Sequence, residues 1–417
     1  MATRTTEDSV PGGWARVIAL VAVIAVPLGL LGGLASWIAS SLGYMPGDSM
    51  ERVWNTPYDR PADTHGNAAW LVGDTVVRSR YDAVTAFDAG SGKRRWEYNP
   101  PRTADICATS RAAAGSVALI GLGDDDKGCA TVAAIDLGNG RELWRTARGP
   151  ADGRLGGGED LLAVGGGLAV GLPGDRTVSA YDLRTGAPRW KAAVPKGCAP
   201  GGVDASAEQV LAILVCDEMK LAAYDPADGK ARWTVPLGDR RPIGTDATVG
   251  FLAAEPAVLG VRMPESYGTG TNSFVSFGPD GRRRALIESV GDNAGIPVGL
   301  QGRVAVDGGK LFADVGGKVV AYDLASGDAV WRESVSGGIT ALHAGGGRVT
   351  VLTRERKGLD QLYVHDAATG ERKDHRTFNR DADDGNAELA GLLRHKDLLI
   401  AVRRGKDVRP FSGYATW

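Results

Sequence analysis

The side chains that most often carry catalysis are present, but their spacing matches no common catalytic motif. No serine lies in a GxSxG sequence, which presents the nucleophile of many hydrolases on a sharp turn. The glycine runs are not followed by the Lys-Ser or Lys-Thr pair that completes a phosphate-binding loop. The histidines also lack the HExxH spacing of a zinc site, because they are scattered as His65, His343, His365, His375 and His395. The sequence therefore predicts no catalytic residues of these classes.

Two acidic stretches share some features with calcium-binding loops. The first is the run of aspartates at 124–126, and the second is 379–385, which has oxygen-bearing side chains at the alternate positions Asn379, Asp381 and Asp383. In the second stretch the glycine comes one position late for an EF-hand loop, and Glu388 is too near to be the twelfth ligand. We expect solvated loops and no bound metal, with calcium as the alternative.

The four cysteines are spaced for disulfide bonds and not for metal binding. No two are closer than 18 residues, so the CxxC spacing of zinc and thioredoxin-like sites is absent. An even number of cysteines behind a hydrophobic segment suggests disulfides in an oxidising compartment.

That hydrophobic segment spans residues 17–39, which are 23 residues without a charge. A helix of this length can cross a bilayer core of about 30 Å. We predict a transmembrane helix over 17–39, preceded by a short cytoplasmic tail over 1–16 and followed by a linker over 40–50. Arg16 directly precedes the span and Arg4 lies 13 positions before it, while Arg52 and Arg60 follow 13 and 21 positions after it, which favours a cytoplasmic N-terminus in the cell membrane. A cleaved signal peptide is the alternative, although its apolar region is usually about 7–15 residues long.

Composition excludes two further classes of protein. The formal net charge is -2, so no overall positive field would attract nucleic acid, and we expect none as a partner. The 60 glycines are about twice the usual share, but 43% hydrophobic residues exclude a disordered chain. The glycines must therefore serve turns in a folded domain.

A repeat is the strongest feature of residues 51–417. Its pattern is an Asp, then a Gly four residues later, then a Trp four residues after that. The complete copies are Asp88, Gly92 and Trp96; Asp136, Gly140 and Trp144; Asp182, Gly186 and Trp190; Asp225, Gly229 and Trp233; and Asp323, Gly327 and Trp331. A sixth copy keeps Asp366 and Gly370 but has Asp374 in the Trp position, and a seventh has a shortened turn over 278–281 and no Trp. The copies recur every 43 to 53 residues, a spacing typical of four-stranded propeller blades.

Each copy predicts a β-hairpin. The Asp side chain can cap the amides of the following turn, and the Gly tolerates a positive φ. The Trp then lies on the returning strand, where a ring can fill the wedge between neighbouring sheets and bury about 200 Å². We therefore interpret these tryptophans as structural and not as a ligand cage.

Short apolar strands lie between the copies, so each repeat supplies about four strands and the domain is predicted to be an all-β propeller. Three strand-like pieces between Glu388 and Ala415 lack a fourth member. Residues 51–54 resemble 141–144 and can supply it, which predicts eight blades, with seven as the alternative. The repeat also aligns the cysteines in two blades and predicts the pairs Cys107–Cys129 and Cys198–Cys216, each within one blade.

The order small residue, aromatic, Asp, turn, Gly and Trp resembles the repeat of the pyrroloquinoline-quinone-like β-propellers over nearly all of 51–417. Quinoprotein dehydrogenases of that family hold the quinone (PQQ) between a tryptophan floor and a disulfide of adjacent cysteines, with bound calcium. No adjacent cysteines occur here, so no cofactor is expected, and PQQ with calcium remains the alternative. The family's assembly lipoprotein carries a lipid-bearing cysteine after a short signal, whereas Cys107 is the first cysteine of this chain. The composition of the chain, which is rich in Ala, Gly and Arg and poor in Lys, resembles that of membrane-anchored propellers of actinobacteria.

These observations favour a non-catalytic scaffold that is held at the membrane and displays loops to an envelope protein or ligand. The alternative is an oxidoreductase, dependent on quinone or another cofactor, whose site has diverged. A sensor is a third reading, but the tail over 1–16 is too short to form a signalling domain and would need a partner.

Overall fold

The computed structural model of the 417-residue chain describes residues 50–59, 67–101, 104–124, 128–147, 160–171, 176–238, 243–263, 272–289, 303–355, 359–379, 388–404 and 407–415. The predicted segments 1–16, 17–39 and most of 40–50 lie outside these residues. Within the part of the chain that the structure describes, no helix is long and apolar enough to cross a membrane.

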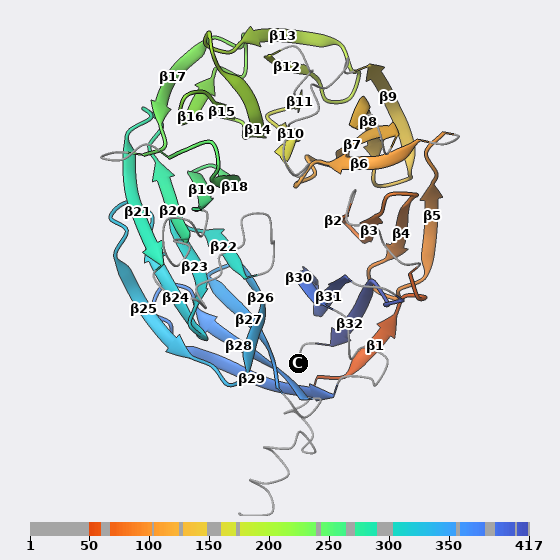
Figure 1. The fold of residues 1–417 in the computed structure, drawn as a ribbon. Helices are drawn as coiled ribbons and strands as arrows, with labels where there is room; N and C mark the ends of the chain where they lie inside the picture. The colour runs from red at the N-terminus through yellow and green to blue at the C-terminus, as the bar shows by residue number, and fades with distance from the viewer. Residues whose placement is uncertain are drawn as a thin grey trace, which may run out of the picture.

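The described residues form eight antiparallel sheets of four strands, arranged in a ring (Figure 1). Blade one contains β2 (Ala68–Val72), β3 (Thr75–Ser79), β4 (Val84–Asp88) and β5 (Arg94–Tyr98). Blade two contains β6 (Asp105–Thr109), β7 (Val117–Asp124), β8 (Gly128–Asp136) and β9 (Arg141–Ala147). Blade three contains β10 (Leu162–Gly165), β11 (Leu168–Gly171), β12 (Thr177–Asp182) and β13 (Pro188–Ala193). Blade four contains β14 (Ala199–Ala205), β15 (Val210–Val215), β16 (Met219–Tyr224) and β17 (Ala231–Pro236).

The second half of the ring repeats this order. Blade five contains β18 (Thr248–Ala254), β19 (Ala257–Arg262), β20 (Asn272–Phe277) and β21 (Arg283–Ser289). Blade six contains β22 (Val304–Asp307), β23 (Lys310–Val315), β24 (Lys318–Asp323) and β25 (Ala329–Ser334). Blade seven contains β26 (Gly338–Gly345), β27 (Arg348–Arg354), β28 (Leu359–Asp366) and β29 (Arg372–Asn379). Blade eight contains β30 (Glu388–His395), β31 (Leu398–Arg404), β32 (Phe411–Ala415) and β1 (Arg52–Asn55).

The ring is closed by the first strand of the domain. β1 pairs with β32, with Trp54 opposite Gly413 and Asn55 opposite Ser412, and so becomes the outer strand of blade eight. In Figure 1, β1 in orange-red lies beside β32 in dark blue. The prediction of an eight-bladed all-β propeller completed by residues near the N-terminus is confirmed, and the seven-bladed alternative is wrong. We call the contact between blade eight and blade one the closing seam.

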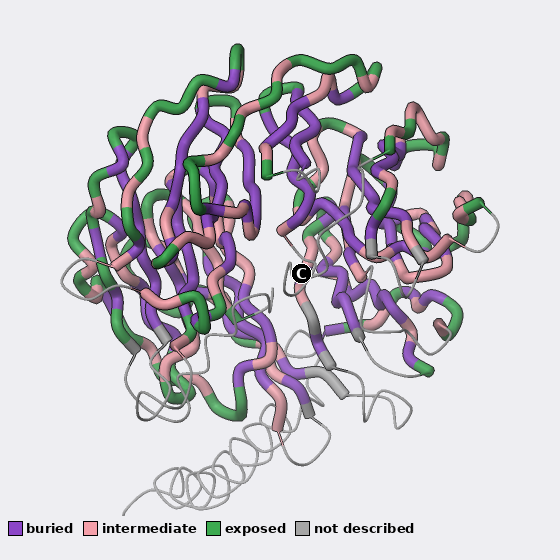
Figure 2. The backbone as a smooth tube through the Cα atoms, turned by 45° about the horizontal axis from the view of Figure 1, so that its top comes forward, coloured by how far each residue is buried: buried purple, intermediate pink, exposed green. Residues whose placement is uncertain are grey.

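The core lies between neighbouring blades, and the middle strands carry most of it. All five residues of β3 are buried, whereas outer strands such as β17 alternate between exposed and partly buried positions. Figure 2 shows the same gradient, with buried backbone inside the blades and exposed backbone at the periphery. Successive strand residues point to opposite faces, so the middle strands contact the sheets on both sides while the outer strands face solvent.

The connections differ between the two faces of the ring. One face carries short turns, such as Gly73 and Asp74 between β2 and β3 and residues 89–93 between β4 and β5. The strand ends at which successive blades are joined lie on the opposite face, and 14 positions separate β9 from β10 and β21 from β22. Longer connections on a rigid scaffold are where binding residues usually lie, so the second face is the one to search for a site.

Candidate binding site at the closing seam

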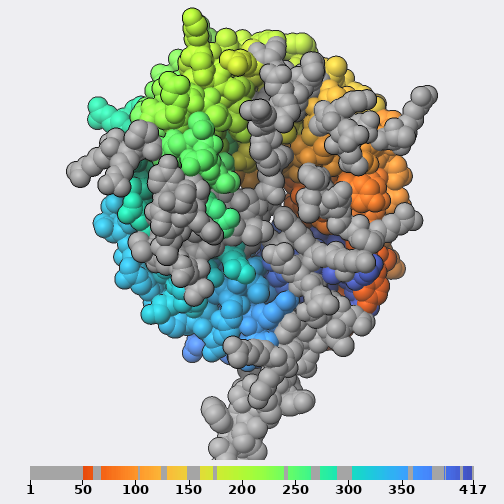
Figure 3. All heavy atoms as spheres, in the orientation of Figure 1, coloured from red at the N-terminus to blue at the C-terminus, as the bar shows by residue number. Residues whose placement is uncertain are grey.

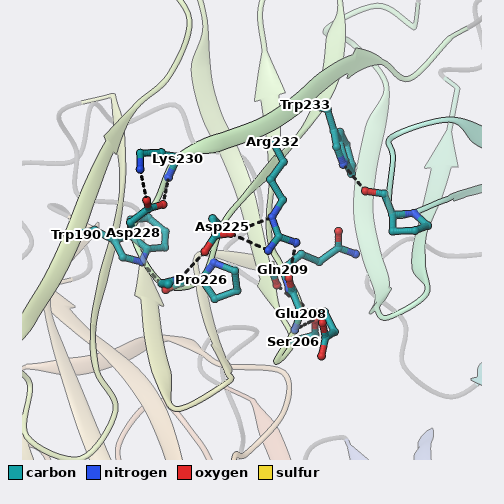
Figure 4. A network of polar contacts seen from close by, with 12 residues as sticks. Trp190, Ser206, Glu208, Gln209, Asp225, Pro226, Asp228, Lys230, Arg232 and Trp233 are labelled. Atoms are coloured by element: carbon teal, nitrogen blue, oxygen red, sulfur yellow. Dashed lines mark hydrogen bonds and ion pairs between the residues drawn. The ribbon is translucent and has the colours of Figure 1, made fainter.

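The repeated turns are held by their aspartates. In blade three, Asp182 Oδ1 accepts hydrogen bonds from the backbone N–H groups of Arg184 (3.2 Å) and Thr185 (3.0 Å), and its carbonyl oxygen accepts one from Gly186 (2.9 Å). Arg189 donates to the other carboxylate oxygen at 2.7 Å. These contacts, that of Arg189 first, hold the pKa of Asp182 well below its ordinary value. Figure 4 shows the equivalent pair of Asp225 and Arg232 in blade four.

Each tryptophan of the repeat motif contacts the turn of the next blade. Trp190 donates from Nε1 to the carbonyl oxygen of Pro226 at 2.8 Å (Figure 4), and the residue after the motif Asp is again the acceptor for Trp144 (Leu183, 2.9 Å) and Trp331 (Ala367, 3.2 Å). The ring also covers the motif glycine. A Cβ added to Gly229, whose φ is +72°, would lie 2.5 Å from Trp190. The structure thus places the motif tryptophans at seams between blades, and we call such contacts ring seams.

The seam between blades five and six has no ring. Ala285 occupies the Trp position, and a Cβ added to Gly327 would meet Ala285 at 3.2 Å. The missing indole donor is replaced by Ser276, whose hydroxyl donates to the carbonyl oxygen of Leu324 at 2.6 Å. Leu324 follows Asp323, so this carbonyl is the equivalent of the one that Trp190 binds in blade four. A residue on the opposite strand has taken over the hydrogen bond of the ring.

The predicted disulfide bonds are present, and they join Cys107 to Cys129 and Cys198 to Cys216. The Cα atoms of the first pair lie 5.7 Å apart and those of the second pair 4.1 Å apart. The first bridge joins β6 to β8 beside Gly121 of β7, where an added Cβ would lie 2.9 Å from the Cys129 sulfur. Gly121 therefore leaves the space that this bridge needs.

The described histidines do not converge on one site. His365 is buried beside Trp331 and Tyr363, and its Nδ1 lies 2.9 Å from the carbonyl oxygen of Gly370. Burial lowers the pKa of His343 on β26, and His395 contacts Asp74 across the closing seam at 3.2 Å. Among the described residues no three His, Cys, Asp or Glu side chains are grouped as a metal site. His65 and most of the two acidic stretches, 125–126 and 380–385, lie outside the described residues.

The quinone site of the dehydrogenases is not reproduced by the described residues. The motif tryptophans lie against glycines at the seams, as Trp190 does against Gly229, so they do not form a floor for a flat cofactor. The two disulfides join residues that are 22 and 18 positions apart and not adjacent cysteines. The described residues therefore do not fit this group.

One ion pair crosses the inner side of the ring. Arg111, which follows β6 of blade two, pairs with Asp204 of blade four and donates to the carbonyl oxygen of Phe251 in blade five. Asp160 accepts a hydrogen bond from the backbone N–H of Phe251 at 3.0 Å. Burial raises the pKa of Asp204 even though Arg111 favours the ionised form. These contacts tie three blades together at the centre.

A cavity of about 400 Å³ lies at the closing seam. In Figure 3 this seam is where the orange first blade meets the blue last blade. Both blades contribute to its lining: Pro57, Tyr58, Asp59, Arg78, Arg80, Asp82, Ala83, Thr85, Phe87, Arg94, Glu97, Asn99 and Pro410. A volume in the range of about 300–1,000 Å³ is usual for small-ligand sites.

A buried chain of charges forms one wall of this cavity. Asp59 accepts from Arg78 Nε at 3.4 Å and also pairs with Arg80, and the side chains of Arg78 and Asp59 are 4% and 8% exposed. Arg80 in turn donates from Nε to Asp82 at 2.9 Å. Asp59 is positioned by blade eight, because its backbone N–H donates to the carbonyl oxygen of Val408 at 2.7 Å. The pair of Asp59 with Arg78 and Arg80 therefore links the last blade to the first.

Arg78 occupies a position that is apolar in the equivalent strands. It lies opposite Thr85, the third residue before the motif Asp. By the same register blades two to seven have Ile120, Gly171, Ala212, Leu259, Ala313 and Val351 at this position. The sequence analysis missed this site, although an arginine at a core position of one repeat was a signal that could have revealed it.

The rim of the cavity is polar and partly exposed. Glu97 Oε2 accepts from Thr85 at 3.2 Å and from Arg94 at 2.8 Å, and the side chain of Arg94 is 55% exposed. Tyr58 is 49% exposed, and the guanidinium of Arg409 lies 4.7 Å from the centre of its ring. Beside these groups, the exposed Asn99 completes a rim that can offer both hydrogen-bond donors and acceptors.

Comparison with known proteins agrees with this architecture. The family model described as outer membrane protein assembly factor BamB matches residues 48–199, 80–263 and 276–384. A search of curated proteins returns no match. Among solved structures, the computationally designed Ika8 protein is similar with a TM-score of 0.56 and 14% identity, covering 88% of this chain and 99% of its own. BamB from Moraxella catarrhalis gives 0.50 and 17%, covering 87% and 97%, and Sqt1 from Saccharomyces cerevisiae gives 0.51 and 11%, covering 88% and 99%.

Proposed function

Because the chain belongs to the PQQ-like propeller family of the outer membrane protein assembly factor BamB, we propose that it is a non-catalytic binding scaffold tethered to the outside of the cell membrane. The ring supplies a rigid support, and the closing-seam cavity supplies the binding site. The ligand is a component of the cell envelope, either a protein or a smaller molecule.

The observation that carries this proposal is the buried arginine at the closing seam. Removing two charges from water costs several kcal/mol per ion, and well-packed apolar residues often serve stability as well or better. Six other blades use Gly or an apolar residue where blade one has Arg78. A residue that breaks the repeat at such a cost, and that lines a cavity, points to binding and not to folding alone.

The tether is supported by the sequence and by the position of β1. The apolar segment 17–39 ends 13 positions before Arg52, where β1 begins. At roughly 3.5 Å per residue, such a chain spans at most about 45 Å. The membrane segment would thus attach at the start of the outer strand of blade eight, where the backbone N–H of Met50 donates to the carbonyl oxygen of Thr377 in blade seven. Two disulfide bonds also favour an oxidising compartment.

Photocrosslinking in cells tests the scaffold. A benzophenone amino acid placed at Tyr58, on the cavity rim, should capture an envelope component. The same residue at Val330, on the outer strand of blade six, is the matched control, because the two positions are 49% and 47% exposed. Capture at Tyr58 that is no greater than capture at Val330 would contradict the proposed site.

The tether has its own test. The full chain should remain in the membrane fraction after a carbonate wash, and protease added outside intact spheroplasts should digest residues 51–417. Recovery of a soluble protein whose N-terminus lies beyond residue 39 would show cleavage instead.

A separate experiment tests the oxidoreductase alternative. Reconstitution of the full chain with PQQ and calcium should yield no retained quinone absorbance, and a stable chromophore with dye-linked oxidation would favour that alternative.

A further inference from the structure

We infer that the ligand of the closing-seam cavity is an uncharged carbohydrate, a mono- or disaccharide unit, which rests on the proposed function and specifies the ligand class. The inference starts from the charge balance of the lining. Three guanidinium groups, Arg78, Arg80 and Arg94, face three carboxylates, Asp59, Asp82 and Glu97.

These charges neutralise one another within the wall. Asp59 is shared by Arg78 and Arg80, Asp82 pairs with Arg80, and Glu97 pairs with Arg94. A phosphate or carboxylate ligand would meet a carboxylate beside each arginine, and a cationic ligand would meet an arginine beside each carboxylate, so attraction and repulsion largely cancel for either ligand. The lining therefore favours a polar ligand without net charge.

The rim keeps hydrogen-bonding capacity for such a ligand. Among the described residues Arg94 has one partner, Glu97, so most of its five N–H groups remain available. Glu97 uses only Oε2 for Thr85 and Arg94, and the amide of Asn99 makes no hydrogen bond within the described part of the chain. The guanidinium of Arg94, the carboxylate of Glu97 and the amide of Asn99 are each planar and present adjacent donor or acceptor atoms.

Vicinal hydroxyl groups match this arrangement. Every sugar hydroxyl both donates and accepts a hydrogen bond, so neighbouring hydroxyls can donate to Glu97 and accept from Arg94 at the same time. The guanidinium of Arg409 lies over one face of the Tyr58 ring, 4.7 Å from its centre, and the apolar face of a sugar ring can pack on the other face of this residue, which is 49% exposed. An extended peptide would instead require apolar pockets at alternate side chains, whereas six of the thirteen lining residues of this cavity are charged.

The test uses the full-length protein in lipid nanodiscs, without sugar-based detergent. Saturation-transfer difference NMR is recorded with glucose, galactose, N-acetylglucosamine, maltose and N,N′-diacetylchitobiose, and with glutamate, inorganic phosphate and trialanine as comparison probes. We expect saturation transfer to at least one sugar and none to the comparison probes.

Two rim variants locate the site. Arg94→Met and Asn99→Ala should each weaken sugar binding by about tenfold, the effect of losing one or two good hydrogen bonds. Both side chains are exposed, so the melting temperature should not change. Arg372→Met is the matched control, because Arg372 lies opposite His365 in blade seven as Arg94 lies opposite Phe87 in blade one. This control should bind sugar as the wild type does.

The results separate this inference from the proposed function. Binding of phosphate, glutamate or trialanine in place of the sugars would overturn the ligand class. Sugar binding that Arg94→Met and Asn99→Ala leave unchanged would overturn the site. If no sugar binds while the benzophenone at Tyr58 still captures an envelope protein, the carbohydrate inference fails and the scaffold stands. If neither occurs, both fail.

Discussion

The ring seam between blades three and four can be compared with the closing seam. Both join neighbouring blades, but they bury different side chains. At the first, the ring of Trp190 covers Gly229 and donates to Pro226, and the seam is filled. At the closing seam, Trp54 covers Gly92 in the same way, although its Nε1 has no hydrogen-bond partner among the described residues, and Arg78 and Asp59 are also buried at this seam. The repeated contacts are sufficient to join two blades. The buried ion pair of the closing seam therefore calls for a reason beyond joining the blades.

The two kinds of contact also differ in their energetics. Burial of an indole ring is favourable without a partner of opposite charge, because it removes apolar surface from water. A buried ion pair must first recover the hydration of both charges, and its net contribution is often small. Breaking either contact lowers stability, but only the ring contact makes a large net contribution to the stability of the intact fold. Five experiments test this distinction, from the largest expected effect to the smallest.

Truncation of a seam ring should have the largest effect. We expect Trp190→Ala to lower the free energy of unfolding by about 3–5 kcal/mol, because it removes a large side chain and leaves a cavity between blades. Urea unfolding followed by far-ultraviolet circular dichroism measures the change. A loss below about 1 kcal/mol would show that the rings are not what joins the blades.

Loss of the shared carboxylate should come next. Asp59→Ala leaves the buried guanidinium of Arg78 without its contact to blade eight, and we expect a loss of about 3 kcal/mol in the free energy of unfolding. Asp228→Ala is the control, because Asp228 pairs on the surface with Lys230, whose side chain is 83% exposed. The control should unfold as the wild type does. An equal loss in both variants would show that the ion pair of the closing seam contributes no more to stability than a surface pair does.

A methyl group added at a seam glycine tests the ring contact from the other side. Gly229 and Gly347 have φ values of +72° and +73°, so alanine meets the same backbone strain at both, about 1–2 kcal/mol. Only at Gly229 would the Cβ lie against Trp190, whereas at Gly347 nothing lies within 4 Å. We expect Gly229→Ala to lose about 1–3 kcal/mol more in unfolding experiments. Equal losses would mean that the glycine serves the turn and not the seam.

Much of the ring seam could be predicted from sequence, because its chemistry is local. Asp182, Gly186 and Trp190 stand at fixed spacings, and a capped turn with a positive φ and a ring on the next strand follows from residue type. Eight blades also followed, since residues 51–54 resemble an outer strand that the C-terminal strands lack. The cysteine pairs needed only the alignment of the repeats.

The contact at the closing seam could not be predicted in this way, although Arg78 at a core position of the repeat marks one of its residues. Asp59 belongs to the segment after β1, and Arg78 and Arg80 belong to β3 and the residue that follows it. These segments meet only when β1 pairs with β32, more than 350 residues away, so no spacing in the sequence reports the contact. Ser276 was missed for a similar reason, because its partner Leu324 lies in the next blade.

The seam between blades five and six should respond weakly to loss of its substitute donor. Ser276→Ala removes one hydrogen bond to the carbonyl oxygen of Leu324, and we expect a loss of about 1 kcal/mol in the free energy of unfolding. Ser334→Ala, on the exposed outer strand of blade six, is the control and should have no effect. A loss as large as that of Trp190→Ala would show that this seam depends on Ser276 alone.

Acid titration should give the smallest effect, and it separates repeat from non-repeat carboxylates by sign. The pKa of Asp182 is lowered in the folded protein, chiefly by Arg189, so its contribution to stability is present above the unfolded value of about 4 and is lost as the pH falls further. Burial raises the pKa of Asp204, so the folded state holds that proton more tightly and this term gains as the pH falls through the raised pKa. The stability difference between wild type and Asp182→Asn should therefore shrink between pH 5 and pH 2. The difference between wild type and Asp204→Asn should move the other way, toward the wild type, as the pH falls from 7 to 4.

Melting temperatures measured across this pH range report both differences. The side chains of Asp182 and Arg189 are 23% and 56% exposed, so solvent screening keeps the first effect small. Opposite slopes would mean that the carboxylates of the repeat stabilise the ring as anions, while the one beside Arg111 is retained despite its cost. Parallel slopes would remove this electrostatic distinction and leave the position of Arg78 as the feature that sets the closing seam apart.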